Sequence, residues 1–447
     1  MEAKTTTMLV RLGVIGALAV HAGSLSAAGF ALIEQSASGV GNAFAGGSAA
    51  AEDASTIFFN PAGMTRLPGK QVVVGVHAID PSVKFTNQGS TLAPPLPPAP
   101  LTGGNGGDAG GWGYVPNLYL SWQLNENLWL GIGINAPFGL TTEYEAGWVG
   151  RYQALNSNLK TININPSIAY KVNDKVSLGF GLSAQQADAT LSKAIDFGLI
   201  CTGVPGCGLT YGGPQARDGS QELSASDWGY GFNLGALFQI SPDMRIGVAY
   251  RSRIKYTLSG TSTFSNVPST PFPLSAIPQF QTSGASADLT VPDSASLTVL
   301  QTFGDKWELM GDITWTQWTA FNQLVVNFAN GAPSNVTTEN WQNAWRFSLG
   351  MNYRPNEKWK LRSGVAWDQT PVPNSTLRTA RIPDNSRTWL ALGASWYFTK
   401  NSSLDFGYAH LFVPSTPINH TEQASGTLVG SYDSSVDIVS LQVVYTF

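Results

Sequence analysis

A period of two runs through most of this sequence. From Lys70 to the C-terminus, apolar and polar residues alternate, most clearly at 162–170, 345–353 and 439–447, and beyond the N-terminal segment there is no run of 18 apolar residues. Alternation of this kind predicts half-buried β-strands, and the lack of a long apolar run excludes a transmembrane helix. Only 12% of the residues are charged and 11% are aromatic, which would make a soluble protein hard to keep in solution. We therefore predict an all-β membrane barrel, in which lipid-facing and interior residues alternate.

The connections between the alternating segments come in two sizes. Six are short and polar, at 124–127, 172–175, 240–243, 303–306, 354–358 and 398–401. Seven are longer and rich in Gly, Pro, Ser and Thr, near 87–111, 139–151, 193–225, 260–282, 329–339, 371–383 and 415–432. These connections predict fourteen antiparallel strands, with the short turns in the periplasm and the long loops outside. An even number of strands places both chain termini in the periplasm.

Aromatic residues gather beside the short turns. A soluble β-sandwich, the main alternative fold, would also alternate, but it has no reason to sort its loops by length or to flank its strands with Trp and Tyr. The placement predicts an aromatic girdle at one membrane interface. Phe447, which ends the last alternating segment, resembles the terminal Phe of bacterial outer-membrane barrels, so we expect the barrel-insertion machinery to read it. The girdle residues are Trp122, Tyr170, Trp307, Tyr353, Trp359, Trp396 and Tyr397.

The first 69 residues depart from the alternating pattern. Residues 1–27 have the basic residues, short apolar run and small residues of a secretory signal peptide, with cleavage after Ala27 or Ala28. Residues 28–69 are rich in Ala, Gly and Ser, and in lipid they would leave backbone groups unsatisfied. We expect them to fill the lumen as a hatch, with the barrel spanning 70–447. Because an exported chain meets an oxidising compartment, we also predict a disulfide between Cys201 and Cys207.

Several short motifs follow one another along the mature chain. They include Gly41-Asn42-Ala43-Phe44-Ala45-Gly46, Asn60-Pro61-Ala62-Gly63-Met64, Asn135-Ala136-Pro137-Phe138-Gly139-Leu140, Trp148-Val149-Gly150-Arg151-Tyr152, Val248-Ala249-Tyr250-Arg251-Ser252 and Arg381-Ile382-Pro383-Asp384-Asn385. In this order they resemble the motifs of FadL-type outer-membrane channels. The resemblance implies a fourteen-stranded barrel with an internal hatch, which takes up hydrophobic small molecules. It implies long-chain fatty acids as substrates, with neutral aromatic or aliphatic hydrocarbons as the alternative.

The same resemblance implies a route through the molecule. A substrate would be caught by the outer loops, pass to a pocket beside the hatch and leave sideways into outer-membrane lipid at a kink in strand three. In strand three, Gly131, Gly133 and Pro137 would then form the lateral gate, although the two Gly could simply face inward beneath the hatch. We expect the turn Asn60-Pro61-Ala62 to lie against strand three, and Phe30 to reach into an apolar pocket.

Alternation also predicts which charged residues face the lumen. Four basic residues, Arg251, Arg253, Arg346 and Arg362, are expected to point inward, as are several carboxylates: Glu308, Asp312, Asp368 and Asp405. These groups could form salt bridges that hold the barrel and hatch together, or an unpaired cation could bind a substrate carboxylate. The resemblance leads us to expect further basic residues at two pocket positions, which here are Asp188 and Gln342. Their replacement would favour a neutral hydrocarbon.

Other classes of function fit the sequence poorly. Only four His are present, and no nucleophile–base pair or metal-ligand spacing is recognisable, so we expect no enzyme, metal site or cofactor. A net charge of −4 argues against nucleic acid as a partner. An outer-membrane phospholipase would need a Ser/His pair on the outer face, a porin would need a strongly charged lumen, and a structural protein or adhesin would not need a plugged lumen.

Overall fold

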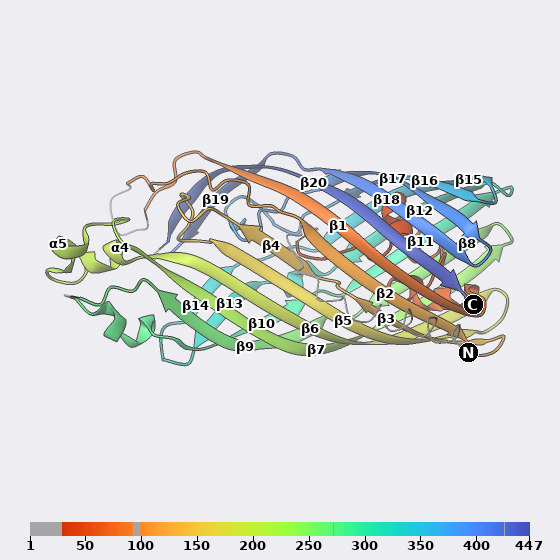
Figure 1. Cartoon of the computed structure of the whole chain (residues 1–447), viewed down its shortest axis with the longest axis horizontal. Coiled ribbons are helices and arrows are strands. Elements are labelled where there is room, and N and C mark those ends of the chain that lie inside the picture. The colour runs from red at the N-terminus through yellow and green to blue at the C-terminus, as the bar shows by residue number, and fades with distance from the viewer. Residues whose placement is uncertain (1–28, 93–98, 271, 424) are drawn as a thin grey trace, which may run out of the picture.

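The strand pairing closes on itself. The computed structural model describes residues 29–92, 99–270, 272–423 and 425–447, so the predicted signal peptide 1–27 and its cleavage site lie outside the described residues. The first strand, β1 (Lys70–Asn87), pairs antiparallel with β2 (Gly113–Gln123) on one side and with the last strand, β20 (Gly426–Thr446), on the other. The result is the closed antiparallel barrel seen from the side in Figure 1.

The sheet has twenty hydrogen-bonded segments, and eighteen of them form the predicted fourteen wall strands. Four wall strands are each broken into two segments, and the remaining two segments lie in outer connections. The outer pair are β14 (Asn335–Thr338) and β19 (Thr416–Glu422). The broken strands are β3 (Leu128–Asn135) with β4 (Gly139–Glu143), β8 (Met244–Arg251) with β9 (Ile254–Ser265), β10 (Ser283–Val291) with β11 (Ser294–Phe303), and β12 (Trp307–Thr316) with β13 (Gln323–Phe328). The unbroken ones are β1, β2, β5 (Asn156–Lys171), β6 (Val176–Asp196), β7 (Asp218–Ser241), β15 (Ala344–Asn356), β16 (Trp359–Asp368), β17 (Arg387–Thr399), β18 (Ser402–Phe412) and β20.

A belt of exposed apolar side chains surrounds the barrel. Alternate residues of β5, such as Ile162, Ile164, Ile168 and Tyr170, point outward and are exposed, while their neighbours are buried. Beside the short turns, Trp307 stacks on Tyr353 with ring centroids 4.2 Å apart. An outward apolar belt bordered by aromatic rings is how a barrel meets lipid. Among the described residues, no helix is long and apolar enough to cross a membrane.

The segment 29–69 lies inside the barrel. It contains α2 (Ala37–Gly41), α3 (Thr56–Phe59) and the 3-10 helix η1 (Pro61–Arg66), and most of its residues are buried. The Ser36 hydroxyl caps α2 by accepting from the Gly39 amide at 3.0 Å. The Asn60 side chain caps η1 in the same way, accepting from Ala62 at 3.1 Å, and Pro61 occupies the first helical position. These caps let short helices form in a segment rich in small residues.

Glycines in the barrel wall make room for this hatch. A Cβ added at Gly179, Gly235, Gly247, Gly364 or Gly407 would lie closer than 3.0 Å to hatch atoms, nearer than real Cβ atoms come. Several of these positions are cross-strand partners, because Gly179 pairs with Gly235, Gly350 with Gly364, and Gly393 with Gly407. The hatch backbone therefore packs directly on the strand backbone. We call these seven residues the glycine belt.

Ion pairs fix the hatch to the opposite wall. Glu52 receives Lys360 Nζ at 2.9 Å and the Arg362 guanidinium at 2.5 Å, and Lys360 also reaches Glu308 at 2.7 Å. Burial alone would raise the pKa of Glu52, but the charges of Arg362 and Lys360 hold that pKa well below its usual range. Glu52 is therefore ionised at neutral pH and bonded to two cations of β16.

The outer connections carry the remaining helices. A disulfide joins Cys201, in α4 (Phe197–Thr202), to Cys207, the first residue of α5 (Cys207–Tyr211); this is the pair expected from the sequence. Two 3-10 helices, η2 (Leu274–Ala276) and η3 (Pro278–Phe280), pack on this disulfide loop through Phe280 and Leu274. Both strands that flank the loop, β6 and β7, run further outward than expected, because they continue to pair as a long hairpin.

The glycine belt predicts a size-sensitive position in the wall. Gly364→Ala should drive a Cβ into the Asn42 backbone and destabilise hatch packing by about 1–3 kcal/mol, the usual cost of overpacking. Gly311→Ala is the matched control, since its Cβ would make only ordinary contacts, with Leu349 at 3.5 Å and the Ser348 carbonyl at 4.0 Å. The midpoint temperature of heat-modified migration on gels should fall for the first variant only. Equal midpoints for both would show that the belt does not hold the hatch.

Candidate functional site

The wall is interrupted where strand three breaks. Hydrogen bonding between β2 and β3 runs from Gln123–Trp129 to Leu118–Ile134 and stops there. After Pro137 the chain turns into β4, which pairs with β5, whereas the outer half of β2 pairs with β1. Among the described residues, no pairing joins β4 to β2. A gap in the hydrogen-bonded wall therefore lies between these two segments.

A cavity of about 220 Å³ occupies this gap, and we call it the gate cavity. Some of its lining residues face the lumen, such as Val115, Asn117 and Asn135, which are almost wholly buried. Others lie on the outer face of the same strands, such as Tyr114 and Ile162, which are exposed. Because both faces of the wall line one cavity, the gate cavity passes through the wall.

The start of the described chain closes the inner side of the gap, and we call residues 29–35 the N-terminal arm. The Leu32 amide donates to the Pro137 carbonyl at 2.8 Å, and the Gly139 amide donates to the Phe30 carbonyl at 2.9 Å. These bonds form a short antiparallel bridge between Ala31 and Phe138. The arm therefore supplies the backbone partners that the break in strand three removes.

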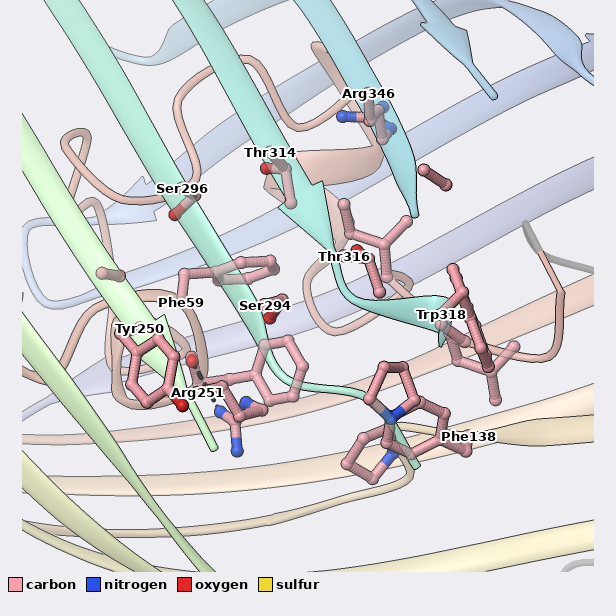
Figure 2. Close-up of a pocket in the computed structure, with 18 of the residues that line it drawn as sticks. Phe59, Phe138, Tyr250, Arg251, Ser294, Ser296, Thr314, Thr316, Trp318 and Arg346 are labelled. Atoms are coloured by element: carbon pink, nitrogen blue, oxygen red, sulfur yellow. Dashed lines mark hydrogen bonds between the residues drawn. The ribbon is translucent and has the colours of Figure 1, made fainter. Parts of the chain in front are cut away.

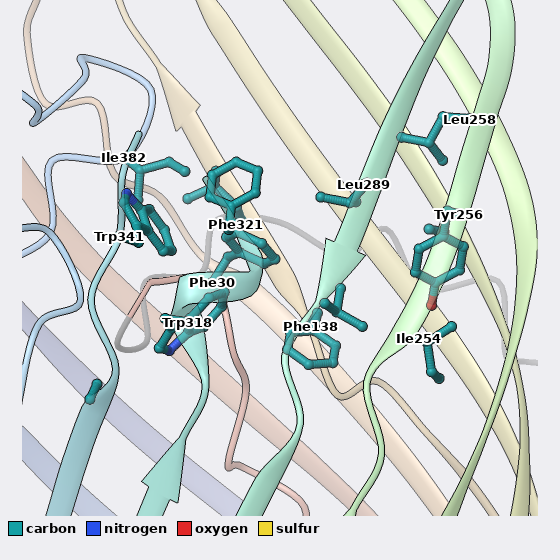
Figure 3. Close-up of a cluster of buried hydrophobic side chains, with 14 of the residues drawn as sticks. Phe30, Phe138, Ile254, Tyr256, Leu258, Leu289, Trp318, Phe321, Trp341 and Ile382 are labelled. Atoms are coloured by element: carbon teal, nitrogen blue, oxygen red, sulfur yellow. The ribbon is translucent and has the colours of Figure 1, made fainter. Parts of the chain in front are cut away.

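Phe30 anchors the arm in an aromatic cluster. Its ring is 2% exposed and lies 4.8 Å from Trp318, 5.4 Å from Phe321, 5.7 Å from Trp341 and 6.0 Å from Phe138, measured between centroids. Figure 3 shows these rings around Phe30, with Leu289 and Ile254 beyond them. Phe30 thus lies in an apolar pocket, where the sequence placed it. The sequence did not reveal that Trp318 and Phe321 would contact Phe30, because both residues lie in the break between β12 and β13, where alternation stops.

Two further cavities lie on either side of the arm. The outer cavity, of about 100 Å³, exposes mostly apolar surface, with Phe30, Leu159, Leu258 and Leu324 in its lining; Glu339 and Arg381 also line it. The inner cavity, of about 160 Å³, lies beside the hatch and is shown in Figure 2. Its lining includes Leu32, Phe138 and Trp318, together with hydroxyl side chains and Arg251 and Arg346. The arm and Phe138 separate the three cavities.

The structure corrects the expected position of the hatch turn. Asn60 donates to the Ser48 and Ala236 carbonyls at 2.7 and 3.0 Å, and Pro61 and Ala62 lie over Gly235 and Gly179. The turn is therefore packed on β6 and β7, away from strand three. The hatch residues that contact Gly131 are Met64 and Ile57. The expectation was wrong because the turn needs the space that paired wall glycines leave, and on strand three Met64 fills that space.

Both glycines of strand three face the lumen. Gly131 lies beneath Met64 and Ile57, and Gly133 beneath the Tyr119 ring. Tyr119 in turn donates its hydroxyl hydrogen to the Gln35 carbonyl at 3.2 Å, and the Gln35 side chain donates to the Ala136 carbonyl at 2.9 Å. Pro137 stands at the break itself. The gap, the arm and the glycines therefore meet at one place in the wall.

Three of the four predicted lumen cations face inward, and Arg253 does not. Arg253 lies outside, with its side chain 42% exposed, and pairs with Asp293 at 3.1 Å. The wall strand breaks between Arg251 and Ile254, and this break reverses the inward and outward positions. Ile254 and Tyr256 are consequently buried in the lumen instead. The prediction failed because alternation was carried across a break that the sequence does not mark.

The two residues that the sequence placed in the pocket instead of basic residues, Asp188 and Gln342, also lie outside it. Asp188 is exposed on the outer face of β6, while its neighbour Ala187 is buried in the aromatic cluster. Gln342 is exposed, and the adjacent Trp341 takes the pocket position. A shift of one residue exchanges the two faces of a strand, so these residues give no reason to favour a neutral hydrocarbon.

The comparisons with known proteins come to the same architecture. A closed barrel with an apolar outer belt and a hatch in its lumen defines an outer-membrane channel protein. The sequence matches the model of the outer membrane protein transport protein family (OMPP1/FadL/TodX) over residues 18–447. The chain belongs to this family, whose members are transport channels and not enzymes.

Individual relatives cover nearly the whole chain. A putative outer membrane protein of Neisseria meningitidis is 31% identical over 96% of this chain and 97% of its own length. A long-chain fatty acid transport protein of Escherichia coli is 30% identical over 91% of each chain. The crystal structure of a Pseudomonas aeruginosa FadL homologue superposes with a TM-score of 0.83, at 26% identity, over 94% of this chain and 100% of that one. A toluene transporter of Pseudomonas putida shares the fold, with a TM-score of 0.65 and 17% identity, over 88% of this chain and 94% of that one.

The arm contains a buried carboxyl that should make its attachment depend on pH. Burial raises the pKa of Glu34 to about 7, although Arg387 and Arg346 lower it, and one carboxyl oxygen has no hydrogen-bond partner among the described protein atoms. In a detached arm the ordinary value near 4.5 would return. The free energy that holds the arm in place is therefore most favourable below pH 4.5, and it weakens by at most on the order of 3 kcal/mol as the pH rises to about 7.

Glu34→Gln should remove this dependence. The measurement is the hydrogen-exchange protection factor of the Leu32 amide, which bonds to Pro137. In the wild-type protein the factor should fall between pH 5 and pH 8, and in the variant it should stay level. A level profile in both proteins would show that Glu34 ionisation does not loosen the arm.

Proposed function

We propose that this protein takes up long-chain fatty acids and releases them sideways into the outer membrane. The observation that carries the proposal is the gate cavity, which passes through the wall where strand three breaks and is closed inside by the arm. Capture at the outer loops is supported by the outer cavity, whose walls are nearly all apolar. The substrate then moves inward past Phe30 and out between β2 and β4.

The sizes of the cavities require the arm to move. At about 100, 160 and 220 Å³, each is smaller than the roughly 300 Å³ at which sites for ordinary small-molecule ligands begin. Phe30 lines the outer cavity, and Leu32 lines both the inner and the gate cavities. Withdrawal of the arm would therefore join all three into one passage. A passage of this length suits an extended chain.

Sideways release follows from the cost of exposing an acyl chain to water. Each methylene group that stays out of water stabilises the substrate by about 0.8 kcal/mol. A path into the periplasm would cross the hatch, whose contacts with the glycine belt and Glu52 ion pairs leave it closely packed. A path through the gate cavity keeps the chain between apolar side chains and lipid. Neutral hydrocarbons could use the same path, but a relative that is 30% identical over 91% of this chain is a long-chain fatty acid transport protein.

Removal of the Phe30 ring should strengthen ligand binding. A substrate that enters the pocket must displace this ring, whose burial stabilises the arm by about 1.5–3 kcal/mol. In Phe30→Ala that cost is absent, so palmitate should bind to the purified protein about tenfold more tightly, while barrel assembly is unchanged. Weaker or equal binding, measured by fluorescence competition, would mean that Phe30 contributes to the bound state instead of blocking it.

A disulfide between arm and gate should stop uptake. Ala31 and Phe138 are bridge partners, so cysteines there can bond, and the native Cys201 and Cys207 would be changed to Ser beforehand. Cells with the oxidised Ala31→Cys, Phe138→Cys protein should take up labelled palmitate at the background rate, and reduction should restore it.

A second disulfide tests whether the body of the hatch moves. Ser48 and Thr298 join the hatch to β11, with their hydroxyl oxygens 2.7 Å apart. The oxidised Ser48→Cys, Thr298→Cys protein should transport normally, because the arm remains free. Normal uptake by the tethered arm would refute gating by the arm, and a block by the hatch tether would show that the whole hatch moves.

A further inference from the structure

The inner cavity contains a cation, Arg251, that has no carboxylate partner among the described residues. Arg251 is the last residue of β8, and its side chain lines the inner cavity together with Phe138 (Figure 2). Leu32, Ile33 and Phe59 form the apolar side of this cavity. Opposite, β11 and β12 present four hydroxyl groups, from Ser294, Ser296, Thr314 and Thr316. Ser294 is the cross-strand partner of Arg251.

Arg251 has few partners of its own. One guanidinium nitrogen donates to the Phe58 carbonyl at 2.7 Å, and the group lies over the Phe58 ring at 4.2 Å. In the part of the chain that the structure describes, no carboxylate lies within 4.0 Å of it. A guanidinium carries five N–H donors, so most of its hydrogen-bonding capacity remains unused.

The other basic residues considered above are engaged differently. Arg362 pairs with Glu52 and with Asp405, and Arg253 pairs with Asp293 outside the lumen. Arg346 lines the same cavity as Arg251 but donates to the Ala43 carbonyl and the Ser348 hydroxyl, and it stacks over Trp389. Asp368, the one carboxylate in the cavity lining, lies across the ladder from Arg346 and is bonded to Arg387 at 3.4 Å.

A partly buried cation of this kind calls for an anion. Charges are rarely taken out of water without a counter-charge, because the desolvation cost is several kcal/mol. The planar fork of a guanidinium matches the two oxygens of a carboxylate. The hydroxyl groups of Ser294, Ser296 and Thr316 can donate further hydrogen bonds, whereas that of Thr314 already donates to Asp312 at 2.8 Å. The apolar side of the cavity leads toward Phe138 and Trp318, and so toward Phe30.

We propose that Arg251 binds the carboxylate of the substrate in the inner cavity, with the acyl chain directed toward the aromatic cluster of Phe30. This inference rests on the proposed uptake of fatty acids and names the residue that distinguishes an acid from a neutral hydrocarbon. Arg251 is then a specificity-determining residue of the channel. The carboxylate stays at Arg251 while the chain takes the place of the Phe30 ring.

The test compares two ligands that differ only at the head group. Palmitate and hexadecanol are titrated against the purified full-length protein in detergent, as wild type, Arg251→Gln, Arg251→Lys and Arg253→Gln. A charge-assisted hydrogen bond to a buried partner accounts for roughly 10- to 100-fold in affinity. Arg251→Gln should weaken palmitate binding by that factor and hexadecanol binding by less than about threefold. Arg251→Lys should retain part of the palmitate affinity, and Arg253→Gln, the outward-facing control, should bind both ligands normally.

The outcomes separate this inference from the function on which it rests. Heat-modified migration on gels identifies correctly assembled variants before titration. Arg251 does not recognise the carboxylate if Arg251→Gln binds palmitate as tightly as the wild type, or if its affinity falls equally for palmitate and hexadecanol. In either case the wild-type channel still binds fatty acids. If the wild type binds hexadecanol but not palmitate, the substrate is neutral and both proposals fall. Selective loss of palmitate in Arg251→Gln alone supports the assignment.

Discussion

Backbone hydrogen bonding within the membrane is the constraint on which the rest of this structure depends. In hydrocarbon, every amide and carbonyl needs a partner, so a sheet that crosses the membrane must close on itself, as β1 and β20 do here. The break after Asn135 violates this rule at one point in the wall. The arm resolves the violation by donating to Pro137 and accepting from Gly139. A gap that would otherwise be too costly is thereby stable when closed and can be opened.

The hatch divides into a fixed part and a part that can move. From Ala37 onward it lies backbone against backbone on the glycine belt, and Glu52 joins it to two cations of β16. To shift this body would break many contacts together. The arm, in contrast, is held by two backbone hydrogen bonds to the break, by single hydrogen bonds to Asp384, Ala136 and Tyr119, and by the buried Phe30 and Leu32 side chains. If the signal peptide is removed as the sequence predicts, the arm stands near a chain end, where a short segment can leave with few other contacts.

The sequence predicted the features that depend on regular alternation, and failed where alternation is interrupted. Strand number and the barrel follow from a period of two and from loop lengths, whereas the expected place of Phe30 followed from the family resemblance. Arg253, Asp188 and Gln342 were assigned to the wrong face, because a break or a one-residue shift reverses inward and outward positions. The position of the Asn60 turn depends on glycines of β6 and β7, which are far from the turn in sequence, so local sequence patterns could not reveal it.

Chain length enters the energetics of gating directly. To open the gate, the substrate must offset the burial of Phe30, about 1.5–3 kcal/mol, and two backbone hydrogen bonds, each about 0.5–1.5 kcal/mol net. At about 0.8 kcal/mol for each buried methylene, roughly three to eight methylenes offset these contributions, and the other hydrogen bonds of the arm add to that number. A long acyl chain exceeds this number, whereas a small hydrocarbon barely reaches it. In the mechanism that we propose, a chain whose carboxylate is bound at Arg251 lies where it can replace the Phe30 ring, and this replacement couples binding at the inner cavity to opening at strand three.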